Sequence, residues 1–306
     1  MRVVVTGAGG FLGRATVAAL AARRSDDEIL LLDRTAVLAP DSRFLAAAID
    51  LADAGPAQRA CRDADVVIHL AAMPGGAAEA DPDESRRTNL QAPLAMLASS
   101  PRGARFVYAS SIAVFGADLP VKVDDETLPR PALTYGAHKL MVETALADAV
   151  RRGDVNGVAL RFPGVVARPG DGAGLRSAFM NTIFHAMAES RDQILPVRPE
   201  ATLWLMSVRV AAENLLHAAF GDISGAERAV LTLPVVRTSM ENLVGTIRKA
   251  TNSRSRIRWQ PDAMLETLFG AYPELDARRA EAGGFRSDGT LQRLVDHVFA
   301  DRKAYI

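Results

Sequence analysis

Short apolar runs and segments with helical periodicity alternate along the first 70 residues of the chain. A continuous, β-branched apolar run is typical of a buried parallel strand, and apolar residues at helical spacing are typical of a helix packed on a sheet. Strands that alternate with helices predict a doubly wound parallel α/β sheet with right-handed crossovers. We expect strands at 3–5, 29–32, 44–49 and 66–70, and helices at 11–24 and 53–62.

The pattern continues to residue 162 and then changes. Residues 163–174 hold two prolines and four glycines, and shorter helical and extended pieces follow. We therefore expect a large domain of residues 1–162, to which 205–236 return, and a smaller C-terminal region formed by 163–204 and 237–306. The further elements predicted are a Gly-, Ala- and Pro-rich loop at 71–82, helices at 84–99 (with a bend at Pro93), 133–151 and 208–220, and strands at 105–109, 158–162 and 229–234.

A glycine-rich turn joins the first predicted strand to the first predicted helix. It contains Gly7, Gly9, Gly10 and Gly13, which satisfy the spacing Gly-x-x-Gly-x-x-Gly. Glycine lets the backbone turn tightly and lets a pyrophosphate approach the N–H groups at the start of the helix. The same pattern also occurs where a strand and a helix merely pack closely, so the turn alone does not establish a nucleotide site.

An acidic residue after the second strand distinguishes these two interpretations. Asp33 ends the strand at 29–32, about 20 residues beyond the glycines, where a carboxylate accepts hydrogen bonds from the adenosine ribose hydroxyls. It also repels a 2′-phosphate, which predicts NAD rather than NADP as the cofactor. Arg34, the next residue, weakens that preference. The loop at 71–82 follows the carboxyl end of a strand, the edge where ligands bind in such sheets, so we expect it to cover the cofactor.

Candidate catalytic residues come later in the chain. Tyr135 and Lys139 are four apart near the start of a helix and therefore lie on one face. An ammonium close to a phenol lowers the pKa of the phenol, which predicts Tyr135 as a general base. Ser111 follows the strand at 105–109, where it is placed to orient the reacting hydroxyl. A solvated helix face is the alternative explanation for a Tyr and Lys pair; the order of the preceding motifs favours the catalytic one.

These motifs, in this order, resemble the extended short-chain dehydrogenase/reductase family, in the branch of NAD-dependent epimerases and dehydratases, from residue 1 to about residue 300. That resemblance implies a Rossmann fold with a smaller substrate-binding region. It also implies a homodimer, for which Leu140, Leu146 and Val150 are suitable, although they are equally suitable for the core. The matching pieces are TGAGGFLG at 6–13, Asp33, DL at 50–51, HLAA at 69–72, Asn89, SSIAVFG at 110–116, YGAHK at 135–139, LRFPGVV at 160–166 and DARRAEAGGF at 276–285.

The resemblance also assigns residues to the site. Ser111, Tyr135 and Lys139 are the implied catalytic residues, Asp50 and Leu51 contact the adenine, and Pro163 lies beside the nicotinamide. The implied cofactor contacts in full are Gly7, Gly10, Phe11, Leu12, Gly13, Asp33, Asp50, Leu51, Leu70, Ala71, Ala72, Asn89, Tyr135, Lys139, Pro163 and Val165. The implied substrate contacts are Met73, Ser111, Ile112, Arg168, Arg176 and Trp204, although for Trp204 core packing is an equally good explanation.

Within the branch, SSIAVFGADLP, YGAHK and QILPVRP are most similar to the D-erythronate dehydrogenase subfamily, which oxidises the C2 hydroxyl of a four-carbon sugar acid with NAD. Two departures separate the chain from many epimerases: Gly164 and Thr202 stand where an Asn and an Arg hold a diphosphate. Arg168, Arg176 and Arg209 are unranked candidates for a single carboxylate. A small sugar-acid substrate is therefore expected, with a nucleotide-sugar 4-epimerase, a uronate dehydrogenase and a non-catalytic NAD sensor as alternatives.

Composition narrows the partners further. The chain of 306 residues has 36 basic and 36 acidic residues, a balance that gives no sign of nucleic acid or an anionic membrane as a partner. Cys61 is the only cysteine, so no intrachain disulfide forms and a cytoplasmic location is expected. Because the first predicted strand starts near residue 2, we expect no signal peptide, and because no apolar run approaches about 20 residues, we expect no membrane span. The five histidines show no paired spacing, so no metal site is expected.

Overall fold

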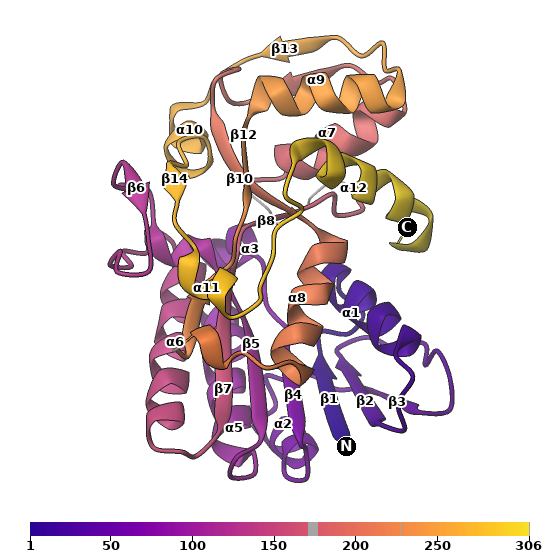
Figure 1. The fold of residues 1–306 in the computed structure, drawn as a ribbon, viewed down its shortest axis with the longest axis vertical. Coiled ribbons are helices and arrows are strands. Elements are labelled where there is room, and N and C mark those ends of the chain that lie inside the picture. Colours follow the sequence, from indigo (N-terminus) through magenta and orange to yellow (C-terminus); the bar gives the residue numbers. More distant parts are fainter. Residues whose placement is uncertain (171–176, 227, 306) are drawn as a thin grey trace.

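The computed structural model describes residues 1–170, 177–226 and 228–305, which form two lobes (Figure 1). The larger lobe is built on a seven-stranded sheet in which every pairing is parallel, so the predicted doubly wound α/β fold is confirmed. In spatial order the strands are β11 (Val230–Thr232), β7 (Asn156–Phe162), β5 (Arg105–Ser111), β4 (Val66–His69), β1 (Arg2–Thr6), β2 (Glu28–Asp33) and β3 (Phe44–Ala48).

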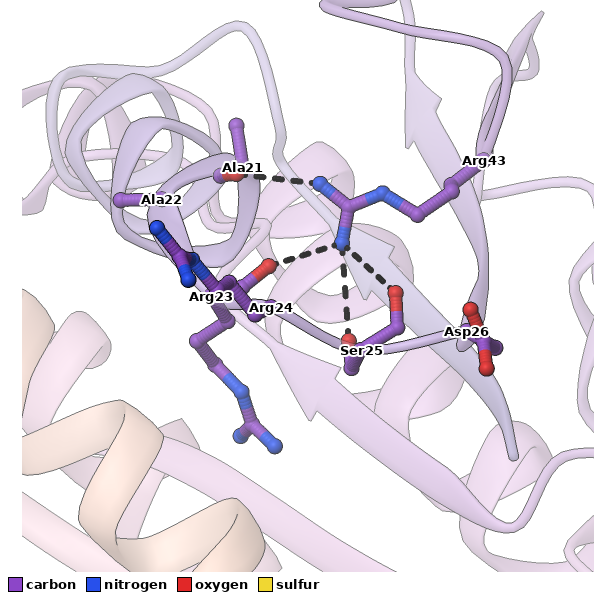
Figure 2. A pocket seen from close by; sticks show the side chains of 7 residues that line it. All are labelled: Ala21, Ala22, Arg23, Arg24, Ser25, Asp26 and Arg43. Atoms are coloured by element: carbon purple, nitrogen blue, oxygen red, sulfur yellow. Dashed lines mark hydrogen bonds between the residues drawn. The ribbon is translucent and has the colours of Figure 1, made fainter.

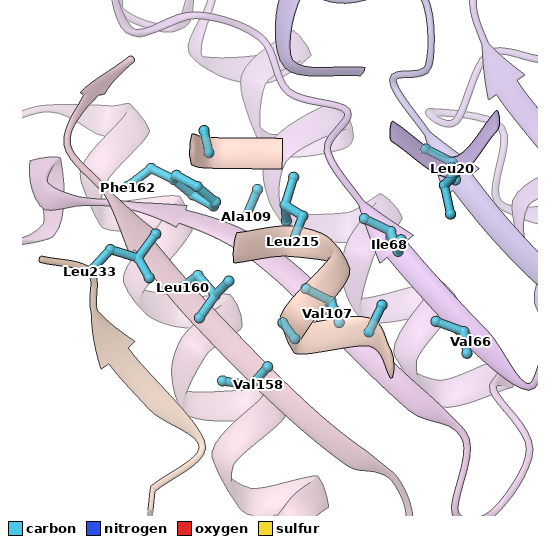
Figure 3. Packing of buried hydrophobic residues seen from close by; sticks show 14 of the residues in the cluster. Leu20, Val66, Ile68, Val107, Ala109, Val158, Leu160, Phe162, Leu215 and Leu233 are labelled. Carbon is cyan, nitrogen blue, oxygen red and sulfur yellow. The ribbon is translucent and has the colours of Figure 1, made fainter. Parts of the chain in front are cut away.

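Helices cover both faces of this sheet. One face carries α1 (Phe11–Ala22) and α8 (Val208–Phe220), and the other carries α2 (Ala54–Cys61), α5 (Ala92–Ser99) and α6 (Thr134–Arg151). Figure 3 shows Leu215 of α8 above Val107 and Leu160 of the sheet, all three fully buried. Burial of an aliphatic side chain of this size stabilises the fold by about 1.5–3 kcal/mol. The apolar runs of the strands thus supply the core that holds both helical layers.

The second lobe has its own small sheets and its own core. Strand β10 (Thr202–Ser207) pairs in parallel with β8 (Gly164–Val166) and antiparallel with β12 (Val236–Ser239). Helices α7 (Phe179–Ala188), α9 (Met240–Thr251) and α12 (Leu291–Tyr305) enclose a separate apolar cluster. The remaining elements are α3 (Gly75–Ala80), α4 (Pro82–Ser85), β6 (Lys122–Val123), β9 (Gln193–Leu195), β13 (Ile257–Trp259), α10 (Ala263–Phe269), β14 (Glu274–Leu275), α11 (Arg278–Ala282) and the short turns η1 (Arg86–Gln91), η2 (Ile112–Phe115) and η3 (Ser224–Ala226).

Two predicted elements differ from the observed ones. The loop expected at 71–82 contains the helix α3, which packs on α6: Gly75 lies beside the Tyr135 side chain, and Glu79 accepts a hydrogen bond from the Thr134 amide. The helix expected at 84–99 is divided by the π-helical turn η1. Pro93 at the start of α5 has no N–H to donate to the preceding turn, which explains why the regular helix is interrupted there. The other predicted helices and strands are confirmed within a few residues.

The apolar face of α6 points into the sheet. Leu146 is fully buried, and Leu140 and Val150 are partly buried against core clusters. The structure thus shows the core role for Leu146, whereas Leu140 and Val150 keep part of their surface exposed. Met141 remains exposed on the same helix. No helix within the described ranges combines the length and the apolar character needed to cross a membrane.

Candidate active site

The glycine-rich turn folds so tightly that side chains are excluded from it. Gly7 has a φ of +68°, and a Cβ there would lie 2.6 Å from the Ala71 nitrogen. A Cβ on Gly13 would lie 2.0 Å from the Gly7 oxygen. Helix α1 begins after Gly10 without any side-chain cap, so the N–H groups of its first turn have no partner within the helix. This cradle fits the pyrophosphate of a dinucleotide.

The side chains of Phe11 and Leu12 pack into the core at the start of α1. The Phe11 side chain is buried against Val208 of α8, and Leu12 and Val165 pack on the same cluster. These contacts fix the start of α1 against α8 and against Val165 of β8. The main-chain amide groups of Phe11 and Leu12, and not their buried side chains, are therefore the parts suited to hold a cofactor.

Asp33 ties the second strand to the glycine turn. Its carboxylate accepts hydrogen bonds from the Gly9 amide at 2.9 Å and from the Thr35 amide at 3.2 Å. Asp33 is the last residue of β2, and β2 pairs with β1, which leads into the turn. An acceptor at this place fits the ribose hydroxyls of an adenosine.

The end of β4 is held by side chains from two sides. The Thr6 hydroxyl accepts hydrogen bonds from the amides of Leu70 (3.2 Å) and Ala71 (3.3 Å). On the other side, the Asn89 amide group accepts from the Met73 N–H at 2.7 Å and donates to the Met73 carbonyl at 3.0 Å. Asn89 is nearly fully buried, and it therefore fixes the path of the chain between β4 and α3.

His69 lies beneath this strand end as a neutral side chain. Burial lowers the pKa of His69 to about 3, and the Lys139 charge acts in the same direction. Because the Thr6 hydroxyl already accepts two amides, it donates its proton to His69 Nδ1 at 2.9 Å. The His69 Nε2 atom is buried without a hydrogen-bond partner within the described residues. The His69 ring stacks on Tyr108, with 5.8 Å between ring centroids.

Ser111, Tyr135 and Arg168 meet at the carboxyl end of β5. The Ser111 hydroxyl and the charge of the Arg168 guanidinium both act on the Tyr135 phenol and favour a lower pKa. Burial of the phenol nevertheless raises the pKa of Tyr135 to about 12. Burial also lowers the pKa of Arg168. Among the candidate arginines that the structure describes, Arg168 is the one whose charge acts on the Tyr135 phenol.

The spacing of Tyr135 and Lys139 predicts a lowered Tyr135 pKa, and for the protein chain by itself that prediction is wrong, because the pKa of Tyr135 is raised. Lys139 is 1% exposed, and its Nζ donates to the Ala109 carbonyl oxygen at 2.7 Å instead of to the phenol. It lies 5.5 Å from the centre of the Tyr135 ring and 4.5 Å from that of Tyr108. Burial lowers the pKa of Lys139 to about 7, against the attraction of Glu143. Desolvation of both side chains outweighs the attraction that sequence spacing suggests.

Sequence reasoning missed a buried ion pair one helical turn beyond Lys139. Glu143 of α6 accepts two hydrogen bonds from the Arg161 guanidinium, and it also accepts one from the Ser110 hydroxyl. The side chains of Glu143 and Arg161 are 2% and 12% exposed. A signal was present in the sequence, because Glu143 has the same four-residue spacing from Lys139 as Lys139 has from Tyr135.

Several other predicted site residues serve the framework. Trp204 is 1% exposed, stacks on Tyr272 at 4.9 Å, and donates its indole N–H to the Pro273 carbonyl, so its position shows the packing role. Ile112 belongs to the same buried cluster. Arg209 is paired with Asp301. Asp50, which follows β3, and Ala72 are exposed. Leu51 and Pro163 are buried. Arg176 lies outside the described residues.

A large hollow lies away from this chemistry. It measures about 580 Å³ and lies at the carboxyl end of α1, whereas the glycine turn is at the amino end (Figure 2). Arg43 spans it and donates to the carbonyl oxygens of Ala21, Arg23 and Ser25. Its guanidinium therefore closes the end of α1 and is engaged in the structure. No group of three or more His, Cys, Asp or Glu side chains in the described ranges is arranged to hold a metal ion.

Known proteins are similar to this chain over nearly its whole length. A D-erythronate dehydrogenase from Cupriavidus necator is 32% identical over 98% of both chains, and one from Haemophilus influenzae is 29% identical over 96% of this chain and 98% of its own. The structure of a nucleoside-diphosphate-sugar epimerase from Agrobacterium tumefaciens superposes with a TM-score of 0.88 at 28% identity, and the match covers 100% of this chain and 95% of the other.

The family model for the NAD-dependent epimerase/dehydratase family matches residues 3–204, which include the glycine turn, Ser111, Tyr135 and Lys139. Together with the relatives, this match implies a nicotinamide cofactor and a small-molecule substrate. The chain is an oxidoreductase of the extended short-chain dehydrogenase/reductase type and belongs to the NAD-dependent epimerase/dehydratase family.

Proposed function

We propose that the protein is an NAD-dependent dehydrogenase that oxidises a secondary hydroxyl of a small sugar acid, at C2 of an acid similar to D-erythronate. The observation that carries this proposal is the Arg168 guanidinium beside the Tyr135 phenol. A planar guanidinium grips a carboxylate with two hydrogen bonds. A 2-hydroxy acid has its carboxylate next to the carbon to be oxidised, so it engages Arg168 and Tyr135 together.

The protein's residues divide the proton chemistry among them. Tyr135 accepts the proton of the substrate hydroxyl, and Ser111, which acts on the same phenol, orients that hydroxyl. Lys139 contributes positive charge beside the Tyr135 ring. Bound NAD supplies the acceptor for the hydride. Asp33 supports the choice of NAD over NADP, because a carboxylate at the end of β2 repels a 2′-phosphate.

Two positions speak against a nucleoside-diphosphate substrate. A Cβ on Gly164 would lie 3.2 Å from the Trp204 carbonyl oxygen, so a longer amide side chain does not fit there without movement. Thr202 uses its hydroxyl to bond the Tyr272 carbonyl at 2.8 Å. Neither position therefore offers a cation or an amide to a diphosphate. We propose that the second lobe, residues 163–204 and 237–306, closes the pocket around the smaller acid.

The proposal includes a homodimer. Helix α6 has Met141 on its outer side with 52% of its surface exposed, next to Leu140, which is only partly buried. An apolar side chain at such a place is suited to an interface between two copies of the helix. Sedimentation equilibrium of the purified protein distinguishes a dimer from a monomer.

The experiment that tests the function is a substrate panel. The purified enzyme is incubated with NAD or NADP and with D-erythronate, its stereoisomers, longer aldonates, uronates and UDP-galactose, and NAD(P)H absorbance is followed. We expect reduction of NAD with short 2-hydroxy acids. Interconversion of UDP-galactose and UDP-glucose without net reduction would show an epimerase instead, and oxidation of uronates alone would show a uronate dehydrogenase.

A further inference from the structure

Helix α6 is joined to two consecutive residues of β5 just before Ser111. Lys139 donates to the Ala109 carbonyl oxygen, and Glu143, one turn later on the helix, accepts from the Ser110 hydroxyl. Both residues are almost completely buried. The catalytic helix and the strand end that carries Ser111 are thereby held in one register.

The Glu143 carboxylate is itself fixed by a third element. Arg161 of β7 donates to both of its oxygens, at 3.0 Å from Nε and at 2.8 Å from Nη2. The Arg161 guanidinium also lies 4.9 Å from the centre of the Phe115 ring in η2. The bonds from Arg161 and from the Ser110 hydroxyl together hold the buried Glu143 carboxylate in place beside β5.

We propose that Glu143, held by Arg161 and Ser110, is a positioning residue that keeps the Lys139 side chain charged and aligned behind Tyr135. The inference rests on the proposed catalytic role of Lys139. A buried ammonium without a counter-charge loses its proton, and a neutral Lys139 has no positive charge to offer to the reacting phenol.

Among the described residues whose charge acts on Lys139, Glu143 is the only carboxylate, and it attracts the Lys139 ammonium. The strands β4 and β5 contribute neutral rings and a carbonyl. The groups that face Lys139 are Glu143 and Tyr135 from α6, Tyr108 and the Ala109 carbonyl from β5, and His69 from β4, with Arg161 of β7 behind Glu143.

The chain allows a direct test, because it contains only four lysines: Lys122, Lys139, Lys249 and Lys303. Protein labelled with a carbon isotope at the lysine Cε gives four NMR signals, and the signal that disappears in Lys139→Met is assigned to Lys139. Its chemical shift as a function of pH then reports the Lys139 pKa without substrate. A failure of the proposed sugar-acid activity therefore leaves this test intact.

We expect Glu143→Gln, which keeps the size and the Ser110 contact, to lower the Lys139 pKa by about one unit or more. That variant leaves Arg161 without its partner and is expected to be unstable. The double variant Glu143→Gln/Arg161→Met removes both buried charges, and we expect it to fold with a smaller decrease in the Lys139 pKa. Ser110→Ala removes a neutral contact and should leave that pKa within about 0.3 units of the original value.

The decisive result is the order of the Lys139 pKa values in the unchanged protein, Glu143→Gln, the double variant and Ser110→Ala. A purely structural role for Glu143 predicts lower melting temperatures with an unchanged Lys139 titration. An unchanged Lys139 pKa in folded Glu143→Gln, or in the double variant if the single one does not fold, would overturn the proposal. A decrease of the same size in Ser110→Ala would overturn it as well, because the effect would then come from disrupted packing and not from charge.

Discussion

Lys139 donates a 2.7 Å hydrogen bond to the carbonyl oxygen of Ala109, two residues before Ser111 in the same strand. Through this bond, the helix that carries Tyr135 is attached to the strand that carries Ser111. Burial raises the pKa of the Tyr135 phenol to about 12, so the phenol needs nearby positive charge to lose its own proton and act as a base near neutral pH. Arg168 and Lys139 are the cations of the protein placed to provide it.

Removing the phenol oxygen should separate chemistry from binding. We expect Tyr135→Phe to lower kcat by about 100- to 10,000-fold, because general-base catalysis is lost while the ring remains. The dissociation constant for NAD, measured by fluorescence titration, should stay within about threefold of the original value. Turnover near that of the unchanged enzyme in a correctly folded Tyr135→Phe protein would contradict the mechanism.

Arg168 should determine recognition of the acid. We expect Arg168→Met to raise KM for the acid by about 10- to 100-fold, since one or two charge-assisted hydrogen bonds are lost, with a partial recovery in Arg168→Lys. Arg228→Met is the matched control, because it removes an exposed arginine that pairs with Glu126. Equal KM values for Arg168→Met and the control would exclude Arg168 as the carboxylate ligand.

Asp33 should set the choice of cofactor. Replacing it by serine keeps an acceptor near the Gly9 amide and removes the negative charge that repels a 2′-phosphate. We expect the ratio of kcat/KM for NAD over that for NADP to fall by about tenfold or more in Asp33→Ser. Steady-state kinetics with both cofactors measures this ratio, and no change in it would show that another group selects the cofactor.

Two glycine substitutions should have opposite effects. In Gly13→Ala the new Cβ would meet the Gly7 oxygen at 2.0 Å, so we expect loss of NAD binding and a lower melting temperature. In Gly245→Ala, in the middle of α9, nothing lies within 4 Å of the new Cβ. We expect that control to gain about 0.5–1 kcal/mol of stability. Thermal melts with and without NAD measure both, and equal destabilisation would contradict the proposed cradle.

His69 should make the fold sensitive to acid. Its pKa is lowered from 6.5 to about 3 in the folded protein, so the unfolded chain binds more protons between these two values. The free energy of unfolding therefore falls as the pH decreases through this window, by at most about 1.4 kcal/mol per unit from this group. Urea unfolding of the protein and of His69→Gln should show a smaller decrease in the variant. Parallel curves would contradict a neutral buried His69.

The sequence determined the parts of the site that depend on local pattern. The apolar runs placed seven strands and their helices, because burial on both faces of a parallel sheet demands continuous apolar strands. Three features could be recognised from the sequence because each depends on local positions: the glycine spacing, Asp33 at the end of a strand, and the four-residue spacing of Tyr135 and Lys139. Glycine spacing reports a close approach of backbone that no side chain permits.

Only the tertiary structure decided which partners these side chains have. Spacing suggested that Lys139 acts on the Tyr135 phenol, whereas folding directs its ammonium to Ala109 and buries it beside Glu143. Arg168 was one of three equivalent arginines until the second lobe brought it to Tyr135. Such pairings join segments that are far apart in the chain, and burial then determines the pKa of each charged group. A local sequence pattern predicts neither the pairings nor the pKa values, because both depend on the packing of several elements at once.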